Sequence, residues 1–214
     1  MPNTSGNAYA LTTLCPLKHK GENQESPILY TRKVLQELPN CTDLQDSPMS
    51  KVPNTYLARF FILDDTVFRG YPFHLDHLQS KYLVFSVEFH GDLETYLKEM
   101  YRAVSKEIHT IWKYGFGFEE VKHEHSFVSY IKKCQVETTF FFNGSTDESL
   151  EEQLKSLYVK QEFSKFVFEH QGASPEDLLA AYKEFDQRVQ PHILAFPTWK
   201  PGVDKLEEIV KTSN

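Results

Sequence analysis

The sequence has few cysteines and no long apolar run, and these absences exclude several classes of protein. Its 214 residues contain three cysteines, Cys15, Cys41 and Cys134, which are far apart and odd in number. This excludes a disulfide framework and a paired-cysteine zinc site, so we expect reduced thiols in a cytoplasmic protein. No segment approaches the roughly 20 apolar residues of a membrane-spanning helix. The first residues also lack the basic and apolar regions of a secretory signal.

Positive charge is scarce as well. The chain has 23 Lys and Arg against 30 Asp and Glu, which gives a formal net charge of -7. This acidic balance argues against nucleic acid as a partner. The sequence contains no GxGxxG nucleotide motif, no phosphate-binding P-loop and no GxSxG nucleophile turn. It is rich in aromatic residues instead, with 17 Phe and 11 Tyr, and a chain of this length buries a sizeable core without covalent staples.

Hydrophobic patterning predicts an α+β fold in residues 1–144. Apolar runs with alternation predict strands at 8–18, 55–63, 81–90 and 136–142. A helix is predicted at 28–38 behind the Ser26-Pro27 cap signal, and a longer one at 93–112, where apolar residues recur every three or four positions. The order β-α-β-β-α-β is the ferredoxin-like split βαβ, an antiparallel sheet in the order 4-1-3-2 with both helices on one face. The alternative is an α+β domain with another strand order.

Residues 145–214 are predicted to be additional C-terminal helices packed on the same domain. Ser145 and Glu148 have the spacing of a capping box, which predicts a helix running to about His170. Ser174-Pro175 opens a second predicted helix. The Phe-rich run FVFEH in the first helix predicts core packing. This extension either covers the open face of the sheet or lengthens a dimer contact.

Strand alternation gives the predicted sheet two different faces. The fully apolar rows belong under the helices, and on strand 55–63 this row is Tyr56, Ala58, Phe60 and Ile62. The opposite face is mixed, combining large apolar with polar and titratable groups: Leu57, Arg59, Phe61, Leu63, Ser86, Glu88, His90, Glu137, Thr139 and Phe141. Such a face suits a ligand cavity or a contact with another sheet or helix.

Three segments resemble the dimeric α/β-barrel group of ferredoxin-like proteins. They read FFILDD, LVFSVEFHGDLETYL and IHTIWKYGFGF, and they are similar to stretches in bacterial proteins of that group. The resemblance covers residues 8–144. It implies that the open sheet face closes on a partner, so we expect a homodimer. It also implies the activities found in that group, which include cofactor-free monooxygenases, heme enzymes and small cyclases.

The predicted catalytic set is Arg59, Glu88 and His90. If strands 55–63 and 81–90 pair as a hairpin, Arg59 and Glu88 are cross-strand neighbours, and His90 projects the same way as Glu88. A carboxylate near an imidazole suits general-base work, and the arginine suits an anionic or enolate oxygen. The alternative is a structural ion pair on a sheet face.

Other side chains are candidates for ligand binding. Phe61, Phe141 and Ser86 are expected to line the cavity, and His74 and His77 lie in an aromatic loop that suits a lid, an acid–base pair or metal ligands. A solvated loop is the alternative for these histidines. His123 and His125 have metal-ligand spacing but lack a third ligand, so we expect a solvated surface there and no metal site.

Heme is the remaining cofactor alternative. His109 and His170 are the candidate axial ligands, but the chain has neither CxxCH nor a GxxDG pattern, so we expect no cofactor. The sequence favours a small cytoplasmic enzyme that acts on a hydrophobic, aromatic or polyene molecule by acid–base or oxygenation chemistry, of the monooxygenase, cyclase or isomerase type. The alternatives are a heme or metal oxidoreductase and a non-catalytic binding or dimerisation module.

Overall fold

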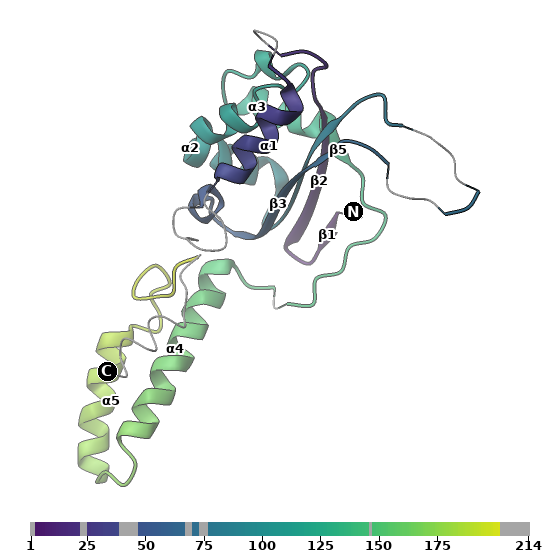
Figure 1. The fold of residues 1–214 in the computed structure, drawn as a ribbon. Coiled ribbons are helices and arrows are strands. Elements are labelled where there is room, and N and C mark those ends of the chain that lie inside the picture. The colour runs from purple at the N-terminus through teal and green to yellow at the C-terminus, as the bar shows by residue number, and fades with distance from the viewer. Residues whose placement is uncertain are drawn as a thin grey trace. The chain divides into compact units, whose positions relative to one another are not determined.

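The computed structural model describes residues 3–21, 25–38, 47–66, 70–72, 77–145 and 147–201 (Figure 1). The chain divides into two compact units, Met1–Asp147 and Glu148–Asn214. The first unit is a sheet with helices, and the second is a helical hairpin. The division lies close to the predicted boundary at residue 144, and packing of the second unit on the first stays a prediction.

Five antiparallel strands form one sheet in the first unit. They are β1 (Thr4–Ser5), β2 (Ala8–Pro16), β3 (Thr55–Leu63), β4 (Tyr82–His90) and β5 (Gln135–Val136). β4 lies between β2 and β3, while the short strands β1 and β5 both pair with the other edge of β2. The predicted α+β class is therefore confirmed. The complete split βαβ order is not established, because β5 is only two residues long.

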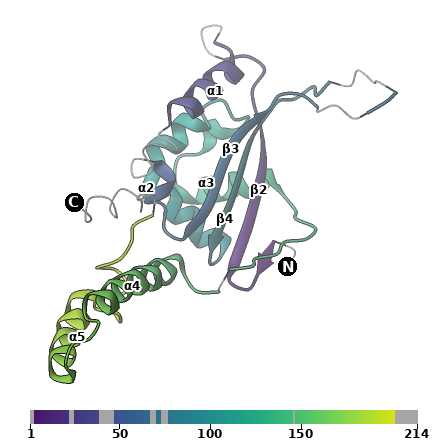
Figure 2. The ribbon, with the colours of Figure 1, turned by 60° about the horizontal axis from the view of Figure 1, so that its bottom comes forward.

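Three helices cover one face of this sheet, as Figure 2 shows. They are α1 (Pro27–Glu37), α2 (Leu93–Ile111) and α3 (Glu124–Cys134), and the 3-10 turns are η3 (Pro48–Lys51) and η4 (Phe118–Glu120). The predicted helix starts behind Ser26 and at residue 93 are confirmed. The Ser26 side chain accepts the Leu29 N–H, and the Asp92 side chain accepts the N–H groups of Glu94 and Thr95. Among the described residues, no helix combines the length and apolar character needed to cross a membrane.

The predicted strand 136–142 is wrong beyond its first residue, because another segment occupies the edge that it would extend along. β1 pairs with the start of β2, and the Asn3 side chain and backbone both bind the backbone of Ala10. The turn between β1 and β2 needs Gly6, whose φ is +60° and where a Cβ would lie 2.4 Å from the Asp147 carboxylate. Thr4 and Ser5 thus form an edge strand that the sequence analysis did not predict.

Aromatic side chains fill the space between the sheet and the helices. Phe85 of β4 stacks on Phe60 of β3 with ring centroids 4.6 Å apart, and both rings meet Trp112 edge-on at 5.5 and 5.6 Å. Farther along β4, Phe89 stacks on Tyr96 of α2 at 3.8 Å. These contacts place the apolar rows of β3 and β4 under the helices, as the alternation predicts.

The second unit consists of α4 (Leu150–Glu169) and α5 (Pro175–Val189). The cap of α4 is Ser149, whose side chain accepts the Glu152 N–H, and not the predicted Ser145. The error arose because both serines precede an acidic residue three positions later. The cap of α5 at Ser174 agrees with its prediction. At the far end of the hairpin from its loop, Lys155 donates to the backbone carbonyls of Val189 and Pro197 at 2.7 Å each.

Replacing Phe85 with alanine tests the aromatic packing under the sheet. Phe85 has no exposed surface, so Phe85→Ala leaves a cavity and should lower the free energy of unfolding by about 3–5 kcal/mol. The matched control is Phe140→Ala, because Phe140 is 80% exposed and its loss should cost less than about 0.5 kcal/mol. Urea denaturation measures both. Equal effects of the two substitutions would contradict the placement of Phe85 in the core.

Candidate functional site

The face of the sheet opposite the helices carries the predicted site. Residues paired directly across antiparallel strands point to the same face, and one row runs Val136, Thr12, Ser86, Arg59 from β5 to β3. The hydroxyl oxygens of Thr12 and Ser86 lie 3.5 Å apart, which agrees with this register. We call this surface the open face.

The open face changes character along the strands. On one side of the Arg59 row, Leu14, Val84 and Phe61 form a row with no polar side-chain atom. On the other side, Glu88 lies between Ala10 and Leu57, and the next paired residue on this face is His90. An apolar half and a titratable half therefore meet at the row that holds Arg59.

Arg59 and Glu88 are diagonal neighbours and not directly opposite each other. Arg59 pairs with Ser86, whereas Glu88 pairs with Leu57. Among the described residues no ion pair joins Arg59 to Glu88 or to any other carboxylate, so the structural ion pair considered from the sequence is not formed within this part of the chain. Arg59 is exposed in a row that also holds Ser86 and Thr12, and an arginine with no carboxylate partner among the described residues suits an anionic oxygen.

His90 has a partner that the sequence did not predict. The register between β3 and β4 shifts between Thr55 and Leu57, so that Tyr56 is the extra residue of a β-bulge. The Tyr56 hydroxyl lies 3.1 Å from Nδ1 of His90, while Thr55 bonds the Tyr96 hydroxyl on the helix side. The prediction that Tyr56 lies in the apolar row is therefore wrong. The bulge turns Tyr56 toward His90, and a phenol next to an imidazole is an acid–base pair.

The predicted aromatic lining is found only in part. Phe61 lies on the open face and is 45% exposed. Phe141 is not a residue of the sheet, because β5 ends at Val136 and the chain then follows β1, with Thr138 and Asn143 bonded to Asn3 and Ser5. The prediction that Phe141, Glu137 and Thr139 share a strand face with Arg59 is wrong for this reason.

The histidine loop between β3 and β4 is described in part. His74 lies outside the described residues. His77 Nδ1 lies 2.7 Å from the Asp65 carboxylate, which also accepts the backbone N–H groups of Thr66 and Leu78. These hydrogen bonds, with that of His77 the largest cause, lower the pKa of Asp65 to about 2. His77 is therefore bonded to the base of its own loop.

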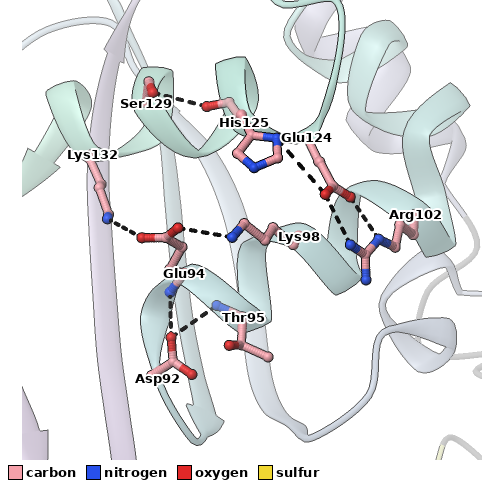
Figure 3. A network of polar contacts seen from close by, with 9 residues as sticks. All are labelled: Asp92, Glu94, Thr95, Lys98, Arg102, Glu124, His125, Ser129 and Lys132. Atoms are coloured by element: carbon pink, nitrogen blue, oxygen red, sulfur yellow. Dashed lines mark hydrogen bonds and ion pairs between the residues drawn. The ribbon is translucent and has the colours of Figure 1, made fainter.

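His123 and His125 belong to the start of α3 and its polar surroundings. His123 is the N-cap, and its Nδ1 accepts the Ser126 N–H. Figure 3 shows His125 beside Glu124, which binds Arg102 of α2 through two hydrogen bonds of 2.6 and 2.9 Å. Glu94 likewise bridges Lys98 of α2 and Lys132 of α3 (Figure 3).

This network joins two helices at the surface, where screening by water leaves each pair little net stabilisation. It supports the solvated-surface interpretation of the histidine pair. The described residues include no group of three or more His, Cys, Asp or Glu arranged to hold a metal ion.

The two candidate heme ligands lie in different units. His109 is exposed on α2, with Nε2 3.1 Å from the Tyr101 hydroxyl. His170 ends α4, where its Nδ1 lies 2.8 Å from the backbone carbonyl of Phe166 and its ring stacks on the Phe166 ring. Neither belongs to the open face.

A pair of cysteines in the core escaped sequence reasoning. Cys134 at the end of α3 packs against the core that holds Cys15 of β2, and Cys15 Sγ accepts the Trp112 indole N–H at 3.3 Å. The neighbouring Cys134 thiol is the main cause that lowers the pKa of Cys15 below its ordinary value, against the effect of burial. Both thiols are free. The sequence could not predict this pair, because the two cysteines are far apart in the chain and only the packing of α3 on β2 brings them together.

An apolar groove between α4 and α5 also escaped prediction. Its volume is about 650 Å³, and aromatic and aliphatic side chains of both helices line it. The FVFEH run was expected to be core, but only Phe166 of its two phenylalanines is buried, and Phe168 is 77% exposed. The number of apolar residues in α4 could have indicated this groove, because one face of a helix cannot bury all of them.

Replacing His77 with alanine tests the loop contact. Because the folded state lowers the pKa of Asp65, the ionised carboxylate stabilises the fold above the ordinary value of 3.8, and this contribution is lost as the pH falls toward 2. His77→Ala should raise the pKa of Asp65 but leave it below 3.8, because the two backbone donors remain. A carboxyl NMR titration measures it, with His125→Ala as the control. An unchanged Asp65 pKa in His77→Ala would show that the contact does not form.

Comparison with known proteins adds no assignment to this geometry: no family model, no curated protein and no solved structure matches the chain.

Proposed function

We propose that residues 3–145 are a ferredoxin-like module of the dimeric α/β-barrel type whose open face binds a hydrophobic molecule with an acidic group. The observation that carries the proposal is the contact of two rows on that face. The apolar row Leu14, Val84 and Phe61 adjoins the row Thr12, Ser86 and Arg59, in which an exposed arginine follows two hydroxyl residues. The sequence analysis predicted an aromatic or polyene ligand. Such a molecule with a carboxylate or enolate has an apolar part and an acidic part, which match the two rows.

The arrangement of the elements supports the fold part of the proposal. β5, β2, β4 and β3 are neighbours in that order, all antiparallel, and α1 to α3 lie on one face. This is the neighbour order of a split βαβ sheet whose last strand is shortened. Within the described residues of the first unit the helices lie on the other face, and the apolar row of the open face suits contact with a ligand, a partner or another layer.

The polar groups of the open face have distinct roles in this proposal. Arg59 binds the acidic oxygens, and its planar guanidinium presents two parallel N–H donors to a carboxylate. The Ser86 and Thr12 hydroxyls lie in the same row and hold the molecule in register. Phe61 and its row contact the apolar body. The molecule therefore lies along the strands, with its apolar body on the Phe61 row and its polar part reaching past Arg59 toward Glu88 and His90.

The chemistry assigned to this face is proton transfer without a cofactor. His90 and Tyr56 form the acid–base pair, and Glu88 is one residue pair closer to Arg59 on the same face. When Tyr56 donates to Nδ1, the proton of the neutral ring is on Nε2, which donates a hydrogen bond to an oxygen of the bound molecule. When Nδ1 donates to Tyr56, Nε2 is the base. The direction of the hydrogen bond between His90 and Tyr56 thus decides which ring nitrogen of His90 carries the proton.

A non-catalytic binding or dimerisation module is the second candidate. The observation that favours it is Leu57, which is 66% exposed on the edge strand β3. A second sheet face, as in dimeric α/β barrels, would cover this side chain. In that case the titratable groups would serve the interface and not a reaction.

Binding of cis-parinaric acid tests the proposed ligand class, because this fluorescent polyene carries a carboxylate. Arg59→Met should weaken binding about 10- to 100-fold, since a charge-assisted pair is worth about 1.5–3 kcal/mol. The parinaric methyl ester should bind the wild type and Arg59→Met alike. Arg32→Met is the matched control, because Arg32 is an exposed arginine of the same unit that is paired with Asp64. Equal binding of acid and ester by the wild type would contradict the role of Arg59.

Turnover of such acids tests the chemical role of His90. His90→Gln should abolish the conversion of any acid that the wild type consumes, while parinaric acid binding changes less than about threefold, because the histidine acts on protons and not on affinity. Mass spectrometry of a panel of aromatic and polyene acids measures the conversion. Tyr56→Phe should shift the pH profile of this conversion. Wild-type turnover that survives His90→Gln would remove His90 from the chemistry, whereas a wild type that converts no acid would leave only the binding module.

A further inference from the structure

Two segments of the first unit fit the same stretch of one strand edge. Residues 3–5, which we call the N-terminal segment, lie antiparallel to residues 8–10 of β2. Farther along the same edge, β5 places Val136 opposite Thr12. An antiparallel register continues residue by residue, so an extension of β5 would bring residues 138–140 opposite the same residues 8–10. The two segments therefore exclude each other from this part of the edge.

The N-terminal segment occupies this edge irregularly at Ala10. The Ala10 N–H donates to the backbone carbonyl of Asn3 at 2.9 Å, whereas the Ala10 carbonyl accepts from the side-chain Nδ2 of Asn3, also at 2.9 Å. Both backbone groups of Ala10 therefore face this edge. A regular antiparallel neighbour satisfies such a pair with its own backbone N–H and carbonyl, and in an extended β5 that neighbour is Thr138. The Asn3 side chain thus takes the place of a strand backbone.

The segment that follows β5 is held next to the edge by the residues that occupy it. Asn3 Nδ2 also donates to the Thr138 hydroxyl at 3.0 Å, and the Thr138 N–H donates to Asn3 Oδ1 at 3.4 Å. The Ser5 hydroxyl accepts the Asn143 N–H at 3.2 Å. Because these contacts are made to the N-terminal segment, its release would free the edge and the segment that fits the edge at the same time.

The sequence of residues 136–142, VETTFFF, is rich in the β-branched and aromatic residues that favour strands. Outside a strand it leaves Phe140 with 80% of its surface exposed. In an extended β5, Phe140 would lie opposite Ala8 and on the same face as Val136, because side chains alternate along a strand. That face is the open face. Since Ala8 pairs with His90 on its other side, the ring of Phe140 would then lie in the row of His90.

We propose that residues 3–5 and residues 138–140 are alternative partners of β2, and that release of the N-terminal segment lets β5 extend to Phe140. The exchange removes three paired positions from β2 and restores three, so backbone hydrogen bonding differs little between the two states. It adds a fourth long strand to the open face and places the Phe140 ring there. The exchange is thus a conformational device that changes the open face, and it does not rest on the ligand proposed for that face.

Amide hydrogen exchange of a Gly6→Val variant of the full chain tests the exchange of strands. Gly6 has a φ of +60°, and a Cβ there would lie 2.4 Å from the Asp147 carboxylate, so a β-branched residue strains the turn of the N-terminal segment. The extended β5 should become the major state. The amide of Phe140 should exchange at least about fivefold more slowly than in the wild type, and those of residues 3–5 should exchange faster.

Gly172→Val is the matched control, because Gly172 has a similar φ of +80° but lies in the loop between α4 and α5. It should leave exchange at both segments as in the wild type. Asn3→Ala is a second variant without backbone strain. It removes the side-chain bonds to Ala10 and Thr138, so it should shift both segments in the same directions as Gly6→Val, by a smaller factor.

Thr138→Pro distinguishes strand exchange from simple loosening of the N-terminus. Proline lacks the N–H that an extended β5 would donate to the Ala10 carbonyl. Added to Gly6→Val, it should abolish the slowing at Phe140 while residues 3–5 keep their fast exchange. Fast exchange at residues 3–5 without slowing at Phe140 in the Gly6→Val protein overturns the proposal. Slowing at Phe140 that survives Thr138→Pro overturns it as well, because the protection then has another source.

Discussion

The stacking of Phe85 on Phe60 and against Trp112 is the contact on which the site depends. Because side chains alternate along a strand, the ring contact that directs Phe60 and Phe85 inward also directs Arg59, Ser86 and Glu88 outward. A slip of one residue would exchange the two faces and bury the charged groups. The hydrophobic core thus sets the positions of polar side chains that it never touches.

Competition for one strand edge explains the unusual form of the sheet. β2 offers its free edge to two segments, and the N-terminal hairpin through Gly6 takes the part next to Ala8 and Tyr9. β5 retains only the pairs with Thr12 and Thr13. The residues after β5 then follow β1 as a loop, and this removes a complete fourth strand from the open face. The face that remains is narrow and is dominated by β2, β3 and β4.

The open face of the sheet and the groove between α4 and α5 differ in chemistry. The open face mixes Arg59, Glu88 and His90 with aliphatic and aromatic groups, so it matches a molecule with both polar and apolar parts. The groove of the hairpin has no charged lining, and the described residues of its unit include four buried apolar side chains, Phe166, Phe185, Val189 and Trp199.

Local patterns in the sequence determined the α+β class, the helix caps at Ser26, Asp92 and Ser174, and the outward placement of Arg59, Ser86, Glu88 and His90. Each depends on a period or a cap that acts within a few residues. Tertiary structure decided the rest: the bulge that brings Tyr56 to His90, the loss of Phe141 from the sheet, the Cys15–Cys134 pair and the uncovered groove. These features arise where segments distant in sequence compete for the same edge or leave a face uncovered, and no local period records such competition.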